Sequence, residues 1–199
     1  MASNGKQPIE ASALLVIDVQ ESFRADEARW ATRNNPAFEA NVTRLVDAYR
    51  EAGLPVIWVV HEDGDALFRP GTPYLRLQPW LDRRDDEPLL RKSTRNAFTS
   101  TDLAERLAVL GVRRIAIAGI QTEQCCETTA RVAGDLGYDV DFVTEATLTF
   151  AITDPATGDV QPPDAITRAT EFALRGRFAR IATADGLAAE LETLAACSR

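Results

Sequence analysis

The chain has 199 residues, 45% of them hydrophobic, and a formal net charge of −8 from 30 acidic and 22 basic side chains. This length predicts a single domain over residues 1–199, and the hydrophobic content excludes a disordered or collagen-like chain. The acidic balance, with no basic segment, argues against nucleic acid and anionic membranes as partners.

The first 11 residues, MASNGKQPIEA, carry no apolar core. They do not resemble a secretory signal, and we expect them to form a flexible N-terminal segment. No stretch approaches the roughly 18 apolar residues that suggest a membrane span. The three cysteines are Cys125, Cys126 and Cys197. Adjacent cysteines rarely meet disulfide geometry, so we expect no disulfide framework and a reducing, cytoplasmic location.

Short apolar runs alternate with amphipathic segments along the whole chain. In order, the runs predict strands over 13–19, 55–60, 113–119, 138–146 and 178–183, with a short further segment over 89–93. The amphipathic segments predict helices over 35–53, 100–111, 122–137, 163–176 and 185–196. This alternation is typical of a three-layer α/β/α fold with a mostly parallel, doubly wound sheet of about six strands.

Two long polar connections, over 61–88 and 147–163, interrupt this alternation. Connections of such length usually cover an active site or contact another subunit. In open α/β sheets ligands bind outside the carboxyl ends of the strands. The residues of interest are therefore Asp18, His61, Lys92 and the segment 119–126.

The adjacent cysteines fall where a strand gives way to a helix, in GIQTEQCCETTAR (119–131). Thr122 is expected to be the N-cap of that helix, which places Cys125 and Cys126 in the first turn, about 100° apart. Only one sulfur can face a shared site, and Cys125, closer to the unpaired amides, is the better thiolate candidate. From the residues alone, Cys125 also fits a buried structural cysteine, Asp18 a turn cap and Lys92 an exposed charge.

Three blocks of the sequence resemble the isochorismatase-like cysteine hydrolases. They are LLVIDVQESF (14–23), the lysine of RKSTRNAFTSTDL (Lys92), and GIQTEQCCETTAR (119–131). The resemblance implies that Cys125 is the nucleophile, Asp18 the general base and Lys92 the cation beside them. Cys126 stands where the family usually has valine, so it is expected to fill apolar space.

The resemblance also implies a cis peptide bond between Ile120 and Gln121. The amides of Gln121 and Cys125 would then form an oxyanion hole. Aromatic and polar side chains near these blocks are candidates for substrate binding, and we name Phe23, Trp30 and His61.

The implied reaction is hydrolysis of a carbon–nitrogen bond of a small molecule through a thioester. The alternatives are a vinyl-ether hydrolase releasing pyruvate, a thiol redox protein and a catalytically silent binding module. The nicotinamidase branch of the family binds a metal through an aspartate and two histidines, but this chain has one histidine, so no metal and no other cofactor are expected. A homo-oligomer, dimeric or larger, is the expected assembly.

Overall fold

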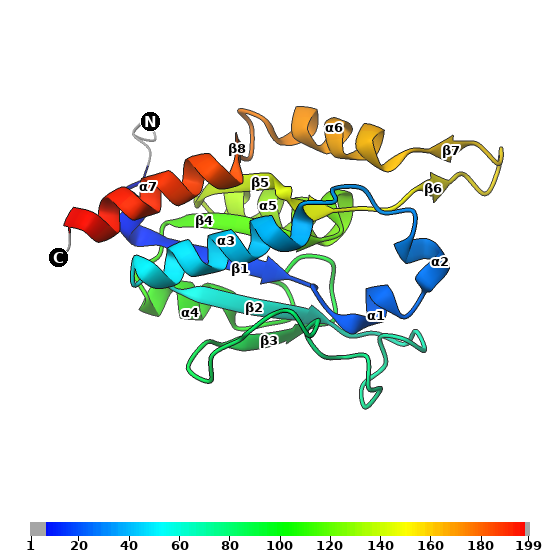
Figure 1. Cartoon of the computed structure of the whole chain (residues 1–199), viewed down its shortest axis with the longest axis horizontal. Helices are drawn as coiled ribbons and strands as arrows, with labels where there is room; N and C mark the ends of the chain where they lie inside the picture. Colours follow the sequence, from blue (N-terminus) through cyan, green and yellow to red (C-terminus); the bar gives the residue numbers. More distant parts are fainter. Residues whose placement is uncertain (1–6, 198–199) are drawn as a thin grey trace.

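A six-stranded sheet with the order β3-β2-β1-β4-β5-β8 forms the centre of the computed structural model, which describes residues 7–197 (Figure 1). Its neighbouring strands all pair in parallel. The strands are β1 (Ser12–Ile17), β2 (Val56–His61), β3 (Leu89–Lys92), β4 (Arg114–Ile120), β5 (Asp139–Leu148) and β8 (Arg180–Ala182). The predicted fold class is thereby confirmed.

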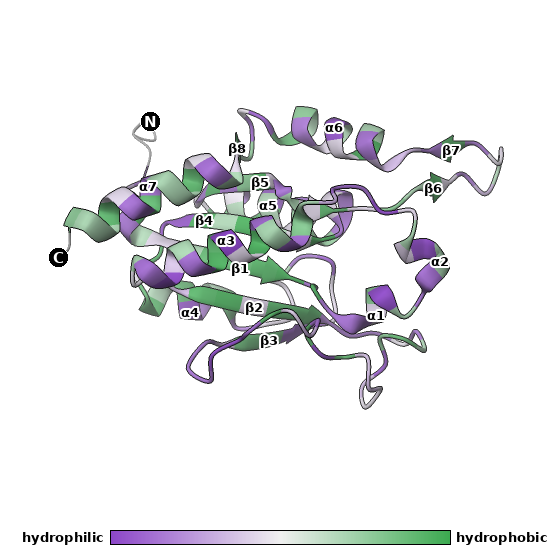
Figure 2. Ribbon diagram, viewed as in Figure 1, coloured by the Kyte–Doolittle hydropathy of each residue, from purple (hydrophilic) through white to green (hydrophobic). Residues whose placement is uncertain are grey.

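Helices cover both faces of this sheet. One face packs against α3 (Phe38–Glu51) and α7 (Ala184–Cys197), and the other packs against α4 (Leu103–Val109) and α5 (Glu127–Asp135). A further helix, α6 (Pro163–Leu174), packs near α5. Because strands covered on both faces contact no water, they read as continuous apolar runs, as the green central strands of Figure 2 show.

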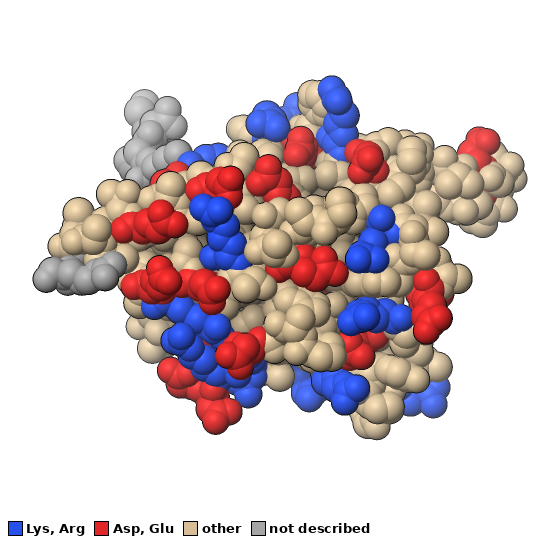
Figure 3. All heavy atoms as spheres, in the orientation of Figure 1, with Lys and Arg blue, Asp and Glu red and all other residues tan. Residues whose placement is uncertain are grey.

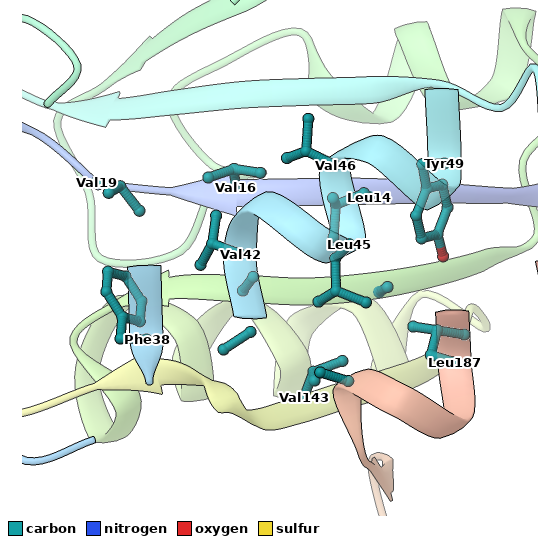
Figure 4. Close-up of a cluster of buried hydrophobic side chains, with 14 of the residues drawn as sticks. Leu14, Val16, Val19, Phe38, Val42, Leu45, Val46, Tyr49, Val143 and Leu187 are labelled. Atoms are coloured by element: carbon teal, nitrogen blue, oxygen red, sulfur yellow. The ribbon is translucent and has the colours of Figure 1, made fainter. Parts of the chain in front are cut away.

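The side chains of β1 illustrate how one strand serves two cores. Leu14 and Val16 point toward α3, where Val42, Leu45 and Val46 meet them (Figure 4). The alternate residues of β1 belong to the core on the opposite face. The apolar spacing within 35–53 is therefore the helical face that closes this layer.

The strand order changes direction at β1. The chain continues from β1 to β2 and β3 on one side, then crosses to β4, β5 and β8 on the other. The carboxyl ends of β1 and β4 therefore adjoin at the point where open α/β sheets form their ligand crevice. The strand arrowheads of β1 and β2 point toward α1 (Glu21–Arg24) and α2 (Glu27–Trp30), two short helices that the sequence did not predict (Figure 1).

The two long connections differ in structure. Residues 62–88 contain no named helix or strand, whereas the second connection holds an antiparallel hairpin of β6 (Ile152–Thr153) and β7 (Val160–Gln161) that projects from the body in Figure 1. Residues 1–6 of the expected N-terminal segment lie outside the described residues, and Ile9–Ala11 form a 3-10 helix.

No helix between residues 7 and 197 has the length and apolar character needed to cross a membrane. Acidic and basic side chains alternate over the face drawn in Figure 3, without a large area of one sign. That face therefore offers no extended region of single charge.

Candidate active site

Asp18 follows β1 at the carboxyl edge of the sheet. Its backbone has φ 56°, a left-handed conformation that few residues other than glycine adopt, and its N–H donates to the Val59 carbonyl at 2.8 Å. The residue is completely buried, and among the described residues its Oδ1 has no hydrogen-bond partner. A buried carboxylate with an unoccupied acceptor atom is suited to receive a proton.

Gln20 secures this turn to the end of β2. Its Oε1 accepts from the His61 backbone N–H at 2.7 Å, and its Nε2 donates to the His61 carbonyl at 3.0 Å. Gln20 is itself fully buried. The side-chain amide thus pairs with β2 as a strand residue would.

Lys92 ends β3, beside His61 in the strand register. Its side chain is fully buried, and Nζ lies 2.7 Å from Asp18 Oδ2, 3.3 Å from Cys125 Sγ and 3.3 Å from His61 Nδ1. An ammonium group has three N–H donors, so these three neighbours account for all of them. The structure therefore brings together Asp18, Lys92 and Cys125, which we call the buried cluster, and places His61 against it.

A close approach of β1 and β4 makes this convergence possible. Gly119 has φ 137°, and a Cβ at this position would overlap the Ile17 carbonyl oxygen. Only glycine fits such an approach. The peptide bond between Ile120 and Gln121 that follows is cis, as expected.

The helix carrying the cysteines begins differently from the prediction. Residues Thr122–Cys126 form a π-helical turn in which the Cys126 N–H donates to the Gln121 carbonyl at 3.2 Å, and α5 continues from Glu127. The expected N-cap role of Thr122 is wrong, because its hydroxyl donates to Thr147 Oγ1 at 2.9 Å and Gln121 occupies the cap position. A neighbouring strand supplied a competing acceptor that the local sequence does not reveal.

The two adjacent cysteines lie in different surroundings. Cys125 lines the pocket described below, whereas Cys126 is completely buried in the apolar core. Burial, and then the nearby Asp18 charge, raise the pKa of the Cys125 thiol to about 12, against the opposing effect of Lys92. Burial likewise raises the pKa of Asp18, and Lys92 opposes this shift. Both shifts favour the protonated form, the thiol of Cys125 and the carboxylic acid of Asp18.

A pocket of about 240 Å³ opens onto Cys125. Its lining consists of aromatic, charged and amide side chains: Phe23, Arg29, His61, Asp63, Asp65, Phe68, Arg95, Gln121, Gln124 and Cys125. Phe23 and Phe68 form an edge-to-face pair with centroids 5.1 Å apart. This volume suits a small molecule with an apolar or flat portion.

The predicted substrate-binding residues divide into two groups. Phe23 and His61 line the pocket, as do the expected oxyanion-hole residues Gln121 and Cys125. Trp30 does not line it, because its ring packs 6.0 Å from that of Phe150, with the Arg33 guanidinium over it at 4.5 Å.

Sequence reasoning missed the two arginines of the pocket. Arg29 donates to Gln121 Oε1 at 2.9 Å, and Arg95 lies with Nη1 3.0 Å from His61 Nε2. Nothing in local sequence separates these arginines from the chain's many surface arginines. The one available signal for Arg95 is its position three residues after Lys92, in a loop that leaves the carboxyl end of β3.

The donor set for a nicotinamidase-type metal does not fit this site. His61 is the sole histidine of the sequence, and its Nε2 faces both Asp63 Oδ2 and the Arg95 guanidinium, each at 3.0 Å. Among residues 7–197, no three histidine, cysteine, aspartate or glutamate side chains gather in a way that could hold a metal ion.

Comparisons with known proteins agree with this architecture. The sequence model described as "Isochorismatase domain" matches residues 12–159. The chain is 31% identical over 147 residues to the uncharacterized isochorismatase family protein YrdC of Bacillus subtilis, covering 73% of this chain and 78% of that protein. It is also 32% identical over 154 residues to Nicotinamidase 3 of Arabidopsis thaliana, covering 70% of this chain and 74% of that protein.

Two further likenesses bear on fold and activity. Streptothricin hydrolase of Streptomyces noursei is 31% identical over 172 residues, covering 84% of this chain and 66% of that protein. The crystal structure of a putative hydrolase of the isochorismatase family from Chromobacterium violaceum superposes with a TM-score of 0.86 at 29% identity, covering 97% of this chain and all of that one.

Proposed function

Because the chain belongs to the isochorismatase family of hydrolases, we propose that it cleaves a carbon–nitrogen bond of a small amide, carbamoyl or ureido compound through a Cys125 thioester. The observation that carries this proposal is the contact of Lys92 Nζ with both Asp18 Oδ2 and Cys125 Sγ. The nicotinamidase and streptothricin hydrolase relatives support amide hydrolysis as the reaction class.

The first step would be proton transfer from Cys125 to Asp18. The Oδ1 atom of Asp18, which has no hydrogen-bond partner among the described residues, is the acceptor. Burial raises the pKa of the Asp18 carboxyl group toward neutral pH, where a general base works best. The sulfur then attacks the carbonyl carbon, a C–S bond forms, and the carbonyl electron pair moves to oxygen. Lys92 stabilises the thiolate as it develops.

The tetrahedral intermediate would place its oxyanion against the amides of Gln121 and Cys125, at the cis bond and the π-helical turn. Protonated Asp18 then gives its proton to the leaving nitrogen, the C–N bond breaks, and an amine or ammonia departs. Asp18 then takes a proton from water, the hydroxide attacks the thioester carbon, and the C–S bond breaks. The product is a carboxylic acid, or a carbamic acid from a carbamoyl or ureido compound, and the proton held by Asp18 returns to the sulfur of Cys125.

A screen of small amides, carbamoyl compounds and ureido acids tests this proposal. Ammonia release is measured together with the mass of the peptide that contains Cys125, because the thioester adds the acyl group to that peptide. We expect turnover with at least one compound class and an acyl adduct on Cys125. Absence of both across the screen would contradict the proposal.

The vinyl-ether alternative follows from the family's name and shares Asp18 as an acid. It requires no nucleophilic sulfur, so a Cys125→Ala variant would keep the activity. Incubation with isochorismate and assay of pyruvate distinguishes the two reactions, since amide hydrolysis releases none.

A further inference from the structure

The Arg95 guanidinium lies at the pocket without an ion-pair partner. None of the ion pairs among residues 7–197 includes it. Arg95 is an exposed residue at the mouth of the pocket, and its polar neighbour on the protein is the His61 ring, with Nη1 3.0 Å from Nε2. Whether this contact satisfies the guanidinium depends on which ring nitrogen of His61 carries hydrogen.

The surroundings of His61 fix that hydrogen on Nε2. Burial, and then the Lys92 charge, lower the pKa of His61, so the ring is neutral at neutral pH. Its Nδ1 lies 3.3 Å from the Lys92 ammonium, which can only donate, and therefore Nδ1 is the acceptor. The hydrogen on Nε2 then points to Asp63 Oδ2 at 3.0 Å.

Arg95 consequently faces a donor rather than an acceptor. Nε2 of His61 has no lone pair to offer, so the 3.0 Å contact does not satisfy any of the five guanidinium N–H groups. Asp63 is close enough for Arg95 to help lower the Asp63 pKa, but the two form no ion pair, and Asp63 Oδ1 already accepts from the Asp65 amide at 2.8 Å.

Arg29, the other arginine that lines the pocket, has contacts of its own within the protein. Arg29 donates to Gln121 Oε1 at 2.9 Å, and its guanidinium lies over the Phe150 ring at 4.7 Å. Arg29 therefore has a polar acceptor and an aromatic support, and within the described part of the chain Arg95 has neither. Of the two, Arg95 is the guanidinium available to a ligand.

The loop that carries Arg95 is held by its own hydrogen bonds. Thr94 Oγ1 donates to the Asn96 carbonyl at 2.9 Å, and the Thr94 N–H donates to Ser100 Oγ at 3.3 Å. The Ala97 N–H donates to the buried Thr129 Oγ1 at 3.1 Å, which joins the loop to α5. These bonds hold the loop from which Arg95 extends, so ligand binding costs less ordering of that loop.

From these contacts we infer that Arg95 determines substrate specificity by binding a carboxylate at the end of the substrate remote from the scissile bond. The planar fork of a guanidinium matches a carboxylate through two parallel hydrogen bonds. The pocket volume of about 240 Å³ limits that substrate to a short amide or ureido acid. This inference rests on the proposed amide chemistry and specifies the class of compound on which it acts.

Two matched amides test the inference in turnover. Succinamate and butanamide carry the same carboxamide on a short chain and differ in the terminal carboxylate. We expect kcat/KM for succinamate to exceed that for butanamide by at least about tenfold, and Arg95→Gln to abolish that preference through KM. Arg95→Lys keeps the charge without the fork and should retain part of the preference.

A second measurement is independent of turnover. The reagents 4-iodobutyrate and 4-iodobutanamide both alkylate sulfur with loss of iodide. They differ in one charged group, which in 4-iodobutyrate lies as far from the reacting carbon as the carboxylate of succinamate does. Peptide mass mapping gives the rate at Cys125 with each reagent, and a carboxylate site raises the rate with 4-iodobutyrate relative to the rate with 4-iodobutanamide. We expect Arg95→Gln to lower this ratio about tenfold, in line with the turnover preference.

Arg91→Gln is the matched control. It removes the same charge from β3, the strand that the Arg95 loop leaves. Arg91 is exposed as Arg95 is, but it lies outside the pocket lining and contacts Glu62 at 3.8 Å. In Arg91→Gln, the ratio of the Cys125 alkylation rates with the charged and the uncharged reagent should equal that of the wild type.

The two failures are distinguishable. Lack of turnover with any amide would refute the proposed function, while the alkylation ratio would still report on Arg95. An unchanged ratio in Arg95→Gln, or a loss of the ratio in Arg29→Gln alone, would overturn the assignment of the carboxylate to Arg95.

Discussion

Lys92 Nζ and Asp18 Oδ2 lie 2.7 Å apart, and both side chains are completely buried although 74 residues separate them in sequence. A buried ammonium and carboxylate each need the other, because neither is solvated. The same lysine also contacts Cys125 Sγ, so the charges of the ion pair act directly on the sulfur within the buried cluster.

Removal of Lys92 should destabilise the fold. In Lys92→Met the Asp18 carboxylate stays buried without its counter-ion, and breaking such a pair costs about 3–5 kcal/mol of unfolding free energy. Urea denaturation measures this loss. The control is Arg106→Met, which breaks a half-exposed pair with Asp102 and should cost less than about 1 kcal/mol. Equal losses in the two variants would contradict the prediction.

The cost of Lys92→Met should depend on pH. Burial already raises the pKa of Asp18 above 3.8, and loss of the opposing lysine charge raises it further. The folded state then holds a proton that the unfolded chain has released, so the contribution of Asp18 to stability is present below about pH 3.8 and is lost as pH rises through the folded pKa. We expect the variant to lose more stability relative to wild type at pH 8 than at pH 5.

Alanine substitutions at the two neighbouring cysteines should have different effects, one on activity and the other on stability. Cys125→Ala removes the sulfur that contacts Lys92 and should lower kcat by at least about a thousandfold, with little change in melting temperature. Cys126→Ala leaves a small cavity in the core and should cost about 1 kcal/mol of stability while turnover continues. Thermal denaturation and the ammonia assay on both variants check the pair. Retained turnover in Cys125→Ala would exclude a thioester route.

Alkylation of Cys125 in the free enzyme should show its raised pKa. With a thiol pKa of about 12, the thiolate fraction rises tenfold with each pH unit. The iodoacetamide rate at Cys125 should therefore climb without a plateau from pH 6 to 9.5. N-acetylcysteine is the reference, and its rate levels off above an ordinary thiol pKa. A rate at Cys125 that levels off above about pH 9, as that of N-acetylcysteine does, would show that the thiol ionises normally.

Gly119→Ala should be among the most disruptive single substitutions. The new Cβ would overlap the Ile17 carbonyl, so β1 and β4 must separate, at a cost of more than about 3 kcal/mol. Gly53→Ala is the matched control, because Gly53 also has positive φ (69°) but nothing within 4 Å of a Cβ. Its cost should be about 1 kcal/mol. Chemical denaturation of both variants measures the two costs. Gly53→Ala reports the cost of positive φ, and Gly119→Ala adds the cost of the steric clash.

The sequence predicted the sheet and the strand ends because their signals are local. Apolar runs identify strands that helices cover on both faces, and the ends of parallel strands meet at one edge. Asp18, Lys92 and Cys125 were therefore candidates, but spacing could not show that they converge. The family resemblance supplied that expectation, and the contacts of Lys92 now give its geometry.

The remaining features depend on contacts between distant segments. Thr122 was expected to cap its own helix, but Thr147 of β5 takes its hydroxyl hydrogen. Trp30 was expected in the pocket, but Phe150 lies against its ring. Arg95 was not predicted as a pocket residue, because its polar neighbour His61 lies on another strand. Such outcomes are decided by tertiary neighbours that a window of sequence does not contain.

The side-chain amide of Gln20, two residues after Asp18, stabilises the end of β2. Asp18 turns out of the ladder into a left-handed conformation, which would leave the last residue of β2 without its neighbour. Gln20 compensates by offering His61 the same pair of hydrogen bonds that a backbone peptide offers. The irregularity at Asp18 is thereby confined to a single residue, and the hydrogen bonding of β2 continues to its end.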